Sequence, residues 1–126
     1  MIVAGMGFRE AARMESLADA WSKARALAPS MTAIDAVATA TEKSENSAFA
    51  SFVRVLGVRS IGVDAFDLVA QETETQSAAS IAARGSGSVA EAAALAAAGS
   101  GSRLIVGRTI SDDGMATCAL AIGGRE

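Results

Sequence analysis

Apolar runs of two kinds alternate along the first part of the chain. Residues 2–6 form a short, continuous apolar run, which is typical of a buried parallel strand. Over residues 14–28 the apolar positions recur at helical spacing, and Pro29 follows, so a helix is predicted to end at this proline. Residues 32–37 predict a second strand, which carries Asp35 near its end.

The middle of the chain repeats this alternation after a polar segment. Residues 39–47 are rich in Thr, Ser and Glu and predict a loop. Residues 49–56 carry an amphipathic helical pattern, and Gly57 stands where a helix C-terminus favours glycine. A third short strand is predicted over residues 60–65 and a helical turn over residues 66–70.

The clearest local pattern marks the start of a further helix. Ser88 is followed three residues later by Glu91, which is a capping box, and Gly99 ends the apolar pattern that follows. A fourth strand is predicted over residues 104–106. An Asp-Asp-Gly turn then leads into a last apolar run over residues 115–122, so the C-terminus is predicted to form a hairpin.

The order of these elements predicts one domain over residues 1–126. Strands that alternate with helices favour a three-layer α/β fold, with a mostly parallel sheet, helices on both faces and a C-terminal antiparallel hairpin. The hydrophobic content of 51 % leaves two alternatives open, a homodimer or a core rich in alanine.

The composition excludes several classes of chemistry. The chain has no histidine, which excludes imidazole bases, Ser-His-Asp triads and histidine-ligated metals. Cys118 is the only cysteine, so no internal disulfide or cysteine-based zinc site forms, and we expect a reduced core residue in a cytoplasmic protein. We expect neither a metal nor a cofactor. The net charge of −3 argues against nucleic acid as a partner, and no apolar segment is long enough to cross a membrane.

Two glycine-containing segments are candidate ligand-binding loops, because open α/β sheets bind ligands beyond the carboxyl ends of their strands. Residues 5–9 follow the first strand, where the alternative is a tight turn. Residues 84–88 precede the best-capped helix and offer N–H groups, hydroxyls and a guanidinium to an anion, where the alternative is simple capping. The candidate ligand-binding residues are Gly5, Gly7, Arg9, Asp35, Arg84, Gly85, Ser86, Gly87, Ser88, Glu91 and Arg108.

Some of these residues have a structural alternative of their own. Asp35 is suited to orient a ligand hydroxyl, or simply to cap a turn. Arg108 lies beyond a strand end, where it joins an anion site or remains a solvated edge charge. Asp112 and Asp113 are expected to form a turn rather than a catalytic pair.

The motifs together resemble the family formed by CobE and the C-terminal domain of CbiG, which belongs to cobalamin biosynthesis. The resemblance spans most of the chain and rests on residues 5–9, 85–95 and 103–106, of which the second segment is the most specific. The lysine that the family carries after its second strand has no match in Asp35-Ala36-Val37.

The resemblance implies a role in building the corrin ring, with a carboxylated precorrin or corrinoid as the ligand and other corrin-pathway enzymes as further partners. The glycine loops, a helix N-terminus and the guanidinium groups of Arg9, Arg84 and Arg108 suit the acetate and propionate arms of such a ligand. Two alternatives remain open. One is a small hydrolase of the pathway that uses Asp35 or Glu91 with water, and the other is a nucleotide-binding protein.

Overall fold

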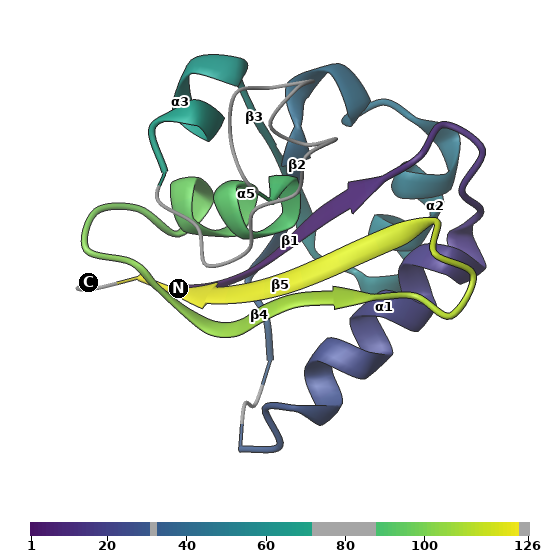
Figure 1. Ribbon diagram of the computed structural model, residues 1–126, viewed down its shortest axis with the longest axis horizontal. Helices are drawn as coiled ribbons and strands as arrows, with labels where there is room; N and C mark the ends of the chain where they lie inside the picture. The colour runs from purple at the N-terminus through teal and green to yellow at the C-terminus, as the bar shows by residue number, and fades with distance from the viewer. Residues whose placement is uncertain (31–32, 72–87, 124–126) are drawn as a thin grey trace.

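The computed structural model describes residues 1–30, 33–71 and 88–123 of the chain. At its centre is a five-stranded sheet in the order β3-β2-β1-β5-β4 (Figure 1). Its strands are β1 (Ile2–Phe8), β2 (Ala36–Ala40), β3 (Arg59–Val63), β4 (Arg103–Ile110) and β5 (Ala116–Ile122).

The sheet is mixed, which corrects the prediction of a mostly parallel sheet. β1 pairs with β2 and β2 with β3 in parallel, whereas β5 pairs antiparallel with both β1 and β4. The predicted C-terminal hairpin of β4 and β5 is confirmed, but β5 also pairs with β1. Two of the four strand pairings in the sheet are therefore antiparallel. It follows that β1, β2, β3 and β4 run in one direction and end at the same edge of the sheet.

Helices cover both faces of the sheet and produce the three layers predicted from the sequence (Figure 1). The first face carries large buried side chains, among them Leu17, Phe49 and Phe52, whereas the long helix on the second face packs almost entirely through alanine. The helices are α1 (Met14–Ala26) and α2 (Ser47–Leu56) on the first face, and α5 (Val89–Ala98) with the short α3 (Ala65–Val69) on the second.

The second strand begins and ends later than the sequence pattern predicts. The prediction was residues 32–37, whereas β2 covers Ala36–Ala40 and is buried along its whole length. Its small side chains give a weak apolar pattern, and Thr39 counts as polar although it is only 1 % exposed. The predicted loop over residues 39–47 is therefore wrong in part, because β2 continues to Ala40 and a 3-10 turn, η1 (Thr41–Lys43), follows directly.

Helix α5 lies very close to β1, and glycine at position 5 makes this approach possible. A Cβ atom on Gly5 would come within 2.0 Å of the Ala90 carbonyl oxygen and 2.6 Å of the Ala94 nitrogen. The start of α5 is fixed by Ser88, whose hydroxyl accepts a hydrogen bond from the Glu91 N–H at 3.2 Å. The predicted N-terminus of this helix is confirmed.

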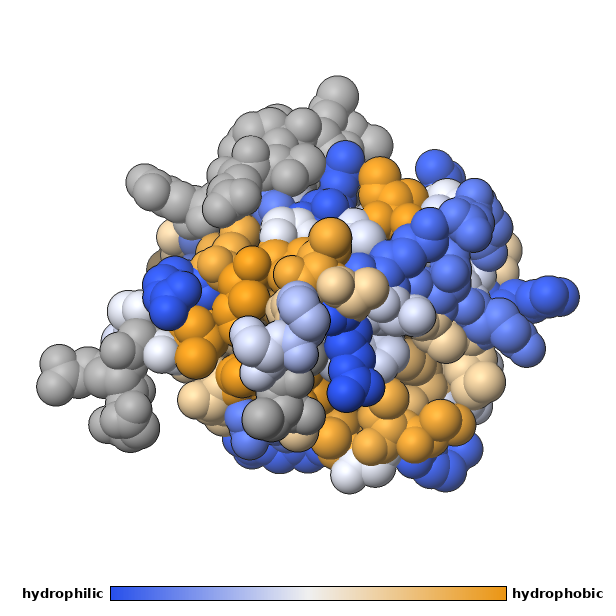
Figure 2. Space-filling view, turned by 90° about the horizontal axis from the view of Figure 1, so that it is seen from below, coloured by the Kyte–Doolittle hydropathy of each residue, from blue (hydrophilic) through white to orange (hydrophobic). Residues whose placement is uncertain are grey.

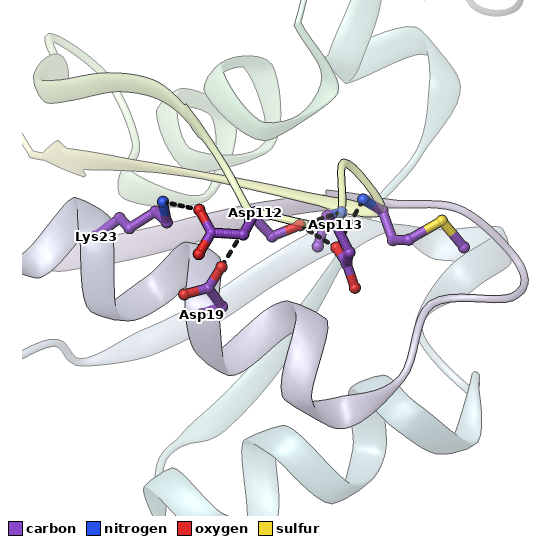
Figure 3. Close-up of polar contacts among 7 residues, drawn as sticks. Asp19, Lys23, Asp112 and Asp113 are labelled. Carbon is purple, nitrogen blue, oxygen red and sulfur yellow. Dashed lines mark hydrogen bonds and ion pairs between the residues drawn. The ribbon is translucent and has the colours of Figure 1, made fainter.

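The turn of the hairpin is tied to α1 by polar contacts (Figure 3). The carboxylate of Asp112 forms an ion pair with Lys23 at 2.5 Å, and the Asp112 N–H donates to the Asp19 carboxylate at 2.7 Å. Asp113, the next residue, accepts a hydrogen bond from the Ser16 hydroxyl at 2.6 Å. The two aspartates thus form a turn, as predicted, and that turn anchors the hairpin to the first helix.

Apolar side chains divide between a dense interior and separate surface areas. The face in Figure 2 shows several apolar areas interrupted by hydrophilic side chains. Cys118 lies wholly inside the core, as predicted, and its burial raises the pKa of the thiol. None of the described helices combines the length and the apolar character needed to cross a membrane.

Candidate functional site

A small hollow opens at the carboxyl ends of β1 and β2, beside the first residue of α5. Its volume is about 110 Å³. This is the edge at which α/β sheets bind ligands, and the N-terminus of a helix adds a positive partial charge there. The hollow is lined by Gly7, Phe8, Thr39, Ala40, Lys43 and Val89.

The hollow begins where backbone pairing between β1 and β2 ends. Their last paired residues are Gly5 and Ala38, although both strands continue beyond this point. One residue further, the Thr39 hydroxyl donates a hydrogen bond to the Met6 carbonyl oxygen at 2.9 Å. A side chain therefore replaces the backbone bond at the base of the hollow, and the strand ends are free to form its walls.

Lys43 brings a positive charge to the hollow. Its ammonium donates a hydrogen bond to the Phe8 carbonyl oxygen at 2.6 Å and lies 5.0 Å from the centre of the Phe8 ring. The Phe8 ring is itself stacked on Phe49, with 5.7 Å between the ring centroids. The Lys43 side chain is 21 % exposed and lies 3.7 Å from the Glu10 carboxylate. An ammonium held in this way is suited to an anionic group that enters the hollow.

Sequence reasoning missed Lys43 because it misplaced the second strand. With β2 ending at Ala40, a lysine does follow this strand, three residues later. The small residues of Ala36–Ala40 are all buried and show no alternation that would mark the true strand.

The first turn of α5 contributes a second group of predicted residues. Ser88 is buried and caps the helix, and Val89 lines the hollow. Glu91 is fully buried, and its Oε2 accepts a hydrogen bond from the Arg108 N–H at 2.9 Å. The structure thus brings Ser88, Glu91 and Arg108 together at one end of α5.

The two glycines of the first predicted loop lie inside a strand. Gly5 and Gly7 both belong to β1, so the expected loop after a strand over residues 2–6 is not formed at these positions. Gly5 faces the backbone of α5, whereas Gly7 lines the hollow. Arg9 follows the end of β1, with an exposed side chain, and its N–H donates to the Met115 carbonyl oxygen at 3.0 Å.

Asp35 lies at the opposite edge of the sheet from the hollow. It precedes β2 instead of standing near its end, because the strand begins at Ala36. Its carboxylate accepts the Ile2 N–H at 2.7 Å, and its own N–H donates to the Ile2 carbonyl oxygen at 2.8 Å. The predicted position of Asp35 at a ligand-binding strand end is therefore wrong. Arg84, Gly85, Ser86 and Gly87 lie outside the described residues.

The arrangement has no metal-binding character among the residues that the structure describes. No group of three or more His, Cys, Asp or Glu side chains is placed to hold an ion in this part of the chain. The fold and the hollow define a small α/β domain with cationic groups at the carboxyl edge of its sheet.

Comparison with known proteins identifies the family of this domain. The family model for the cobalamin synthesis G C-terminus matches residues 2–121, and the chain therefore belongs to this family, as a cobalamin biosynthesis protein of the CobE type. No curated protein matches the sequence.

Two solved structures are similar over nearly the whole chain. The crystal structure of CobE, a protein from the cobalamin (vitamin B12) biosynthetic pathway, has 27 % sequence identity and a TM-score of 0.81, covering 96 % of this chain and 89 % of that one. The cobalamin biosynthesis protein ChiG from Agrobacterium tumefaciens strain C58 has 31 % identity and a TM-score of 0.74, covering 99 % of this chain and 100 % of that one.

Proposed function

We propose that this domain binds a carboxylated precorrin or corrinoid and hands it on to another enzyme of the corrin pathway. The observation that carries the proposal is the Lys43 ammonium, held in a hollow that is also lined by Val89, the first residue of α5. A lysine and a helix N-terminus both favour a carboxylate. Precursors of the corrin ring carry several acetate and propionate arms, so they offer this group repeatedly.

The size of the hollow indicates how such a ligand binds. Pockets that enclose a drug-sized molecule measure roughly 300–1,000 Å³. The hollow, at about 110 Å³, is too small for a macrocycle but large enough for one acidic arm. One carboxylate therefore enters beside Lys43, while the ring lies over the edge of the sheet. Arg9 follows the end of β1 at this edge, and Arg108 lies in the last part of β4.

Titration of the purified protein with hydrogenobyrinic acid, a cobalt-free corrin with free carboxylates, tests the proposal. We expect a saturable change in the corrin absorbance spectrum and no binding of the same corrin after its carboxylates are esterified. Equal binding of the acid and the ester would show that carboxylates are not recognised. Conversion of the corrin during the titration would instead support the hydrolase alternative, with Glu91 rather than the distant Asp35 as its candidate carboxylate.

Transfer needs a second measurement. The corrin-loaded protein is mixed with a corrin-pathway enzyme that consumes the same corrin, and turnover is compared with that of free corrin at the same total concentration. If the protein hands the corrin on, the enzyme should consume corrin from the loaded protein at least as fast as it consumes free corrin. If the enzyme consumes only the corrin that has dissociated from the loaded protein, the result would support binding without transfer.

A further inference from the structure

The ladder between β4 and β5 is interrupted beside the first turn of α5. Two residues of β4, Gly107 and Arg108, stand opposite one residue of β5. Bulges of this kind redirect a side chain and are common next to binding sites. The interruption lies between the consecutive pairs Val106–Leu120 and Thr109–Cys118.

The N–H group of Arg108, which lies within this bulge, is bound by Glu91. The Glu91 carboxylate accepts this hydrogen bond at 2.9 Å, and the side chain is 0 % exposed. Every other residue of α5 is valine, alanine or leucine. A carboxylate buried in such a helix is unfavourable unless it makes polar contacts, and the hydrogen bond from the Arg108 N–H is one such contact.

The bulge sets Arg108 on the far side of α5 from Lys43. Lys43 lies at the β2 side of this helix N-terminus, whereas β4 is the edge strand on the other side of β1 and β5. Arg108 is half-buried, and within the described residues its guanidinium forms no ion pair or hydrogen bond. Lys43 and the backbone of Arg108 therefore lie on different sides of the first turn of α5.

We propose that Glu91 is a positioning residue, which holds the backbone of Arg108 in the bulge so that its guanidinium binds a second carboxylate of the ligand. The inference rests on the proposed function and narrows the ligand class. A ligand that engages both Lys43 and Arg108 carries at least two acidic arms on separate positions of a large ring. A single small carboxylate reaches only one of the two cations.

Four variants measured with hydrogenobyrinic acid test this role: Glu91→Ala, Glu91→Gln, Arg108→Ala and the double variant of Glu91→Ala with Arg108→Ala. Loss of one charge-assisted hydrogen bond weakens binding by about tenfold, so Glu91→Ala and Arg108→Ala each raise the Kd by this factor. Glu91→Gln stays close to the wild type, because the amide oxygen accepts the same N–H. The double variant binds no more weakly than Arg108→Ala alone, because Glu91 acts through Arg108.

Hydrogen exchange at the Arg108 amide gives a readout that does not depend on the ligand. Exchange is faster in Glu91→Ala than in the wild type and stays slow in Glu91→Gln. If Glu91→Ala does not fold, Glu91→Asp takes its place, since its carboxylate is shorter by one methylene and no longer reaches the amide.

Two results overturn the positioning role. One is unchanged exchange at Arg108 in Glu91→Ala. The other is a Glu91→Ala effect on binding that is equally large in the Arg108→Ala background, which would mark a general structural role. If the wild-type protein does not bind the corrin at all, the proposed function fails and the ligand part of this inference fails with it. The exchange measurement still decides whether Glu91 holds the bulge.

Discussion

The hydroxyl of Thr39 donates a hydrogen bond to the carbonyl oxygen of Met6, 2.9 Å away, one residue beyond the last backbone pair between β1 and β2. Both the hydroxyl and the carbonyl oxygen are buried. The bond satisfies a carbonyl that the neighbouring strand no longer reaches, and it does so at the base of the hollow. One threonine thus serves the stability of the sheet and the shape of the candidate site.

Replacing Thr39 by valine tests the contribution of this bond to stability. Valine keeps the shape of threonine but leaves the Met6 carbonyl without its donor, so we expect a loss of ~1–3 kcal/mol in the free energy of unfolding. Urea unfolding followed by circular dichroism measures the change. Thr39→Ser is the matched control, because it keeps the hydroxyl. A Thr39→Val variant that is as stable as Thr39→Ser would show that the bond contributes little.

Gly5 is expected to be the least replaceable glycine of the sheet. In Gly5→Ala the new methyl group would lie 2.0 Å from the Ala90 carbonyl oxygen, so α5 must move away from β1. Forced overpacking of this kind costs ~1–3 kcal/mol or more. In the control Gly62→Ala, on β3, the nearest atom is the Thr41 hydroxyl oxygen at 3.2 Å, and a smaller loss is expected. Equal thermal midpoints for the two variants would contradict the close contact.

The elements that the sequence predicts well are those with short-range signals at their ends. Ser88 caps α5 through the bond expected of it, and Gly57 ends α2 with a φ of +72°. Asp113 lies in the turn of the hairpin, where Gly114 also has a φ of +72°. Each of these features depends on a few neighbouring residues, so its physics is contained in the local sequence.

The features that the sequence did not predict depend on contacts between distant segments. The insertion of β5 beside β1 made the sheet mixed, and no local pattern specifies which neighbour a hairpin strand chooses. β2 was misplaced because alanine and threonine give little contrast between buried and exposed positions. That error moved Asp35 to a strand end and left Lys43 out of the predicted residues.

Asp113 makes stability depend on pH at the acid end. Hydrogen bonds from the hydroxyls of Ser111 and Ser16, and from the Met115 N–H, lower the pKa of its carboxyl from 3.8 to about 2. A carboxyl whose pKa is lower in the folded state than in the unfolded state stabilises the fold at pH values above its unfolded-state pKa. This contribution disappears as the pH falls through the folded-state pKa. We therefore expect stability to decrease from about pH 4 to pH 2.

The variant Asp113→Asn isolates this contribution. Its unfolding free energy is expected to be lower than that of the wild type at pH 7 and to change less between pH 4 and pH 2. Glu15→Gln, which removes an exposed carboxylate from α1, controls for the change in net charge. A wild-type curve and an Asp113→Asn curve that run parallel down to pH 2 would show that another group causes the acid sensitivity.

The two lysines of the chain allow the charge in the hollow to be removed separately from a charge elsewhere on the protein. Lys43→Met keeps an apolar chain of similar length against Phe8 but removes the ammonium from the hollow, and a charge-assisted hydrogen bond to a carboxylate is worth ~1.5–3 kcal/mol. We expect at least a tenfold rise in the Kd for hydrogenobyrinic acid. Lys23→Met is the matched control, because it removes the same charge from the ion pair with Asp112 at the hairpin turn. This variant should bind the corrin as tightly as the wild type. A similar loss of affinity in both variants would mean that net charge, rather than the hollow beside α5, attracts the ligand.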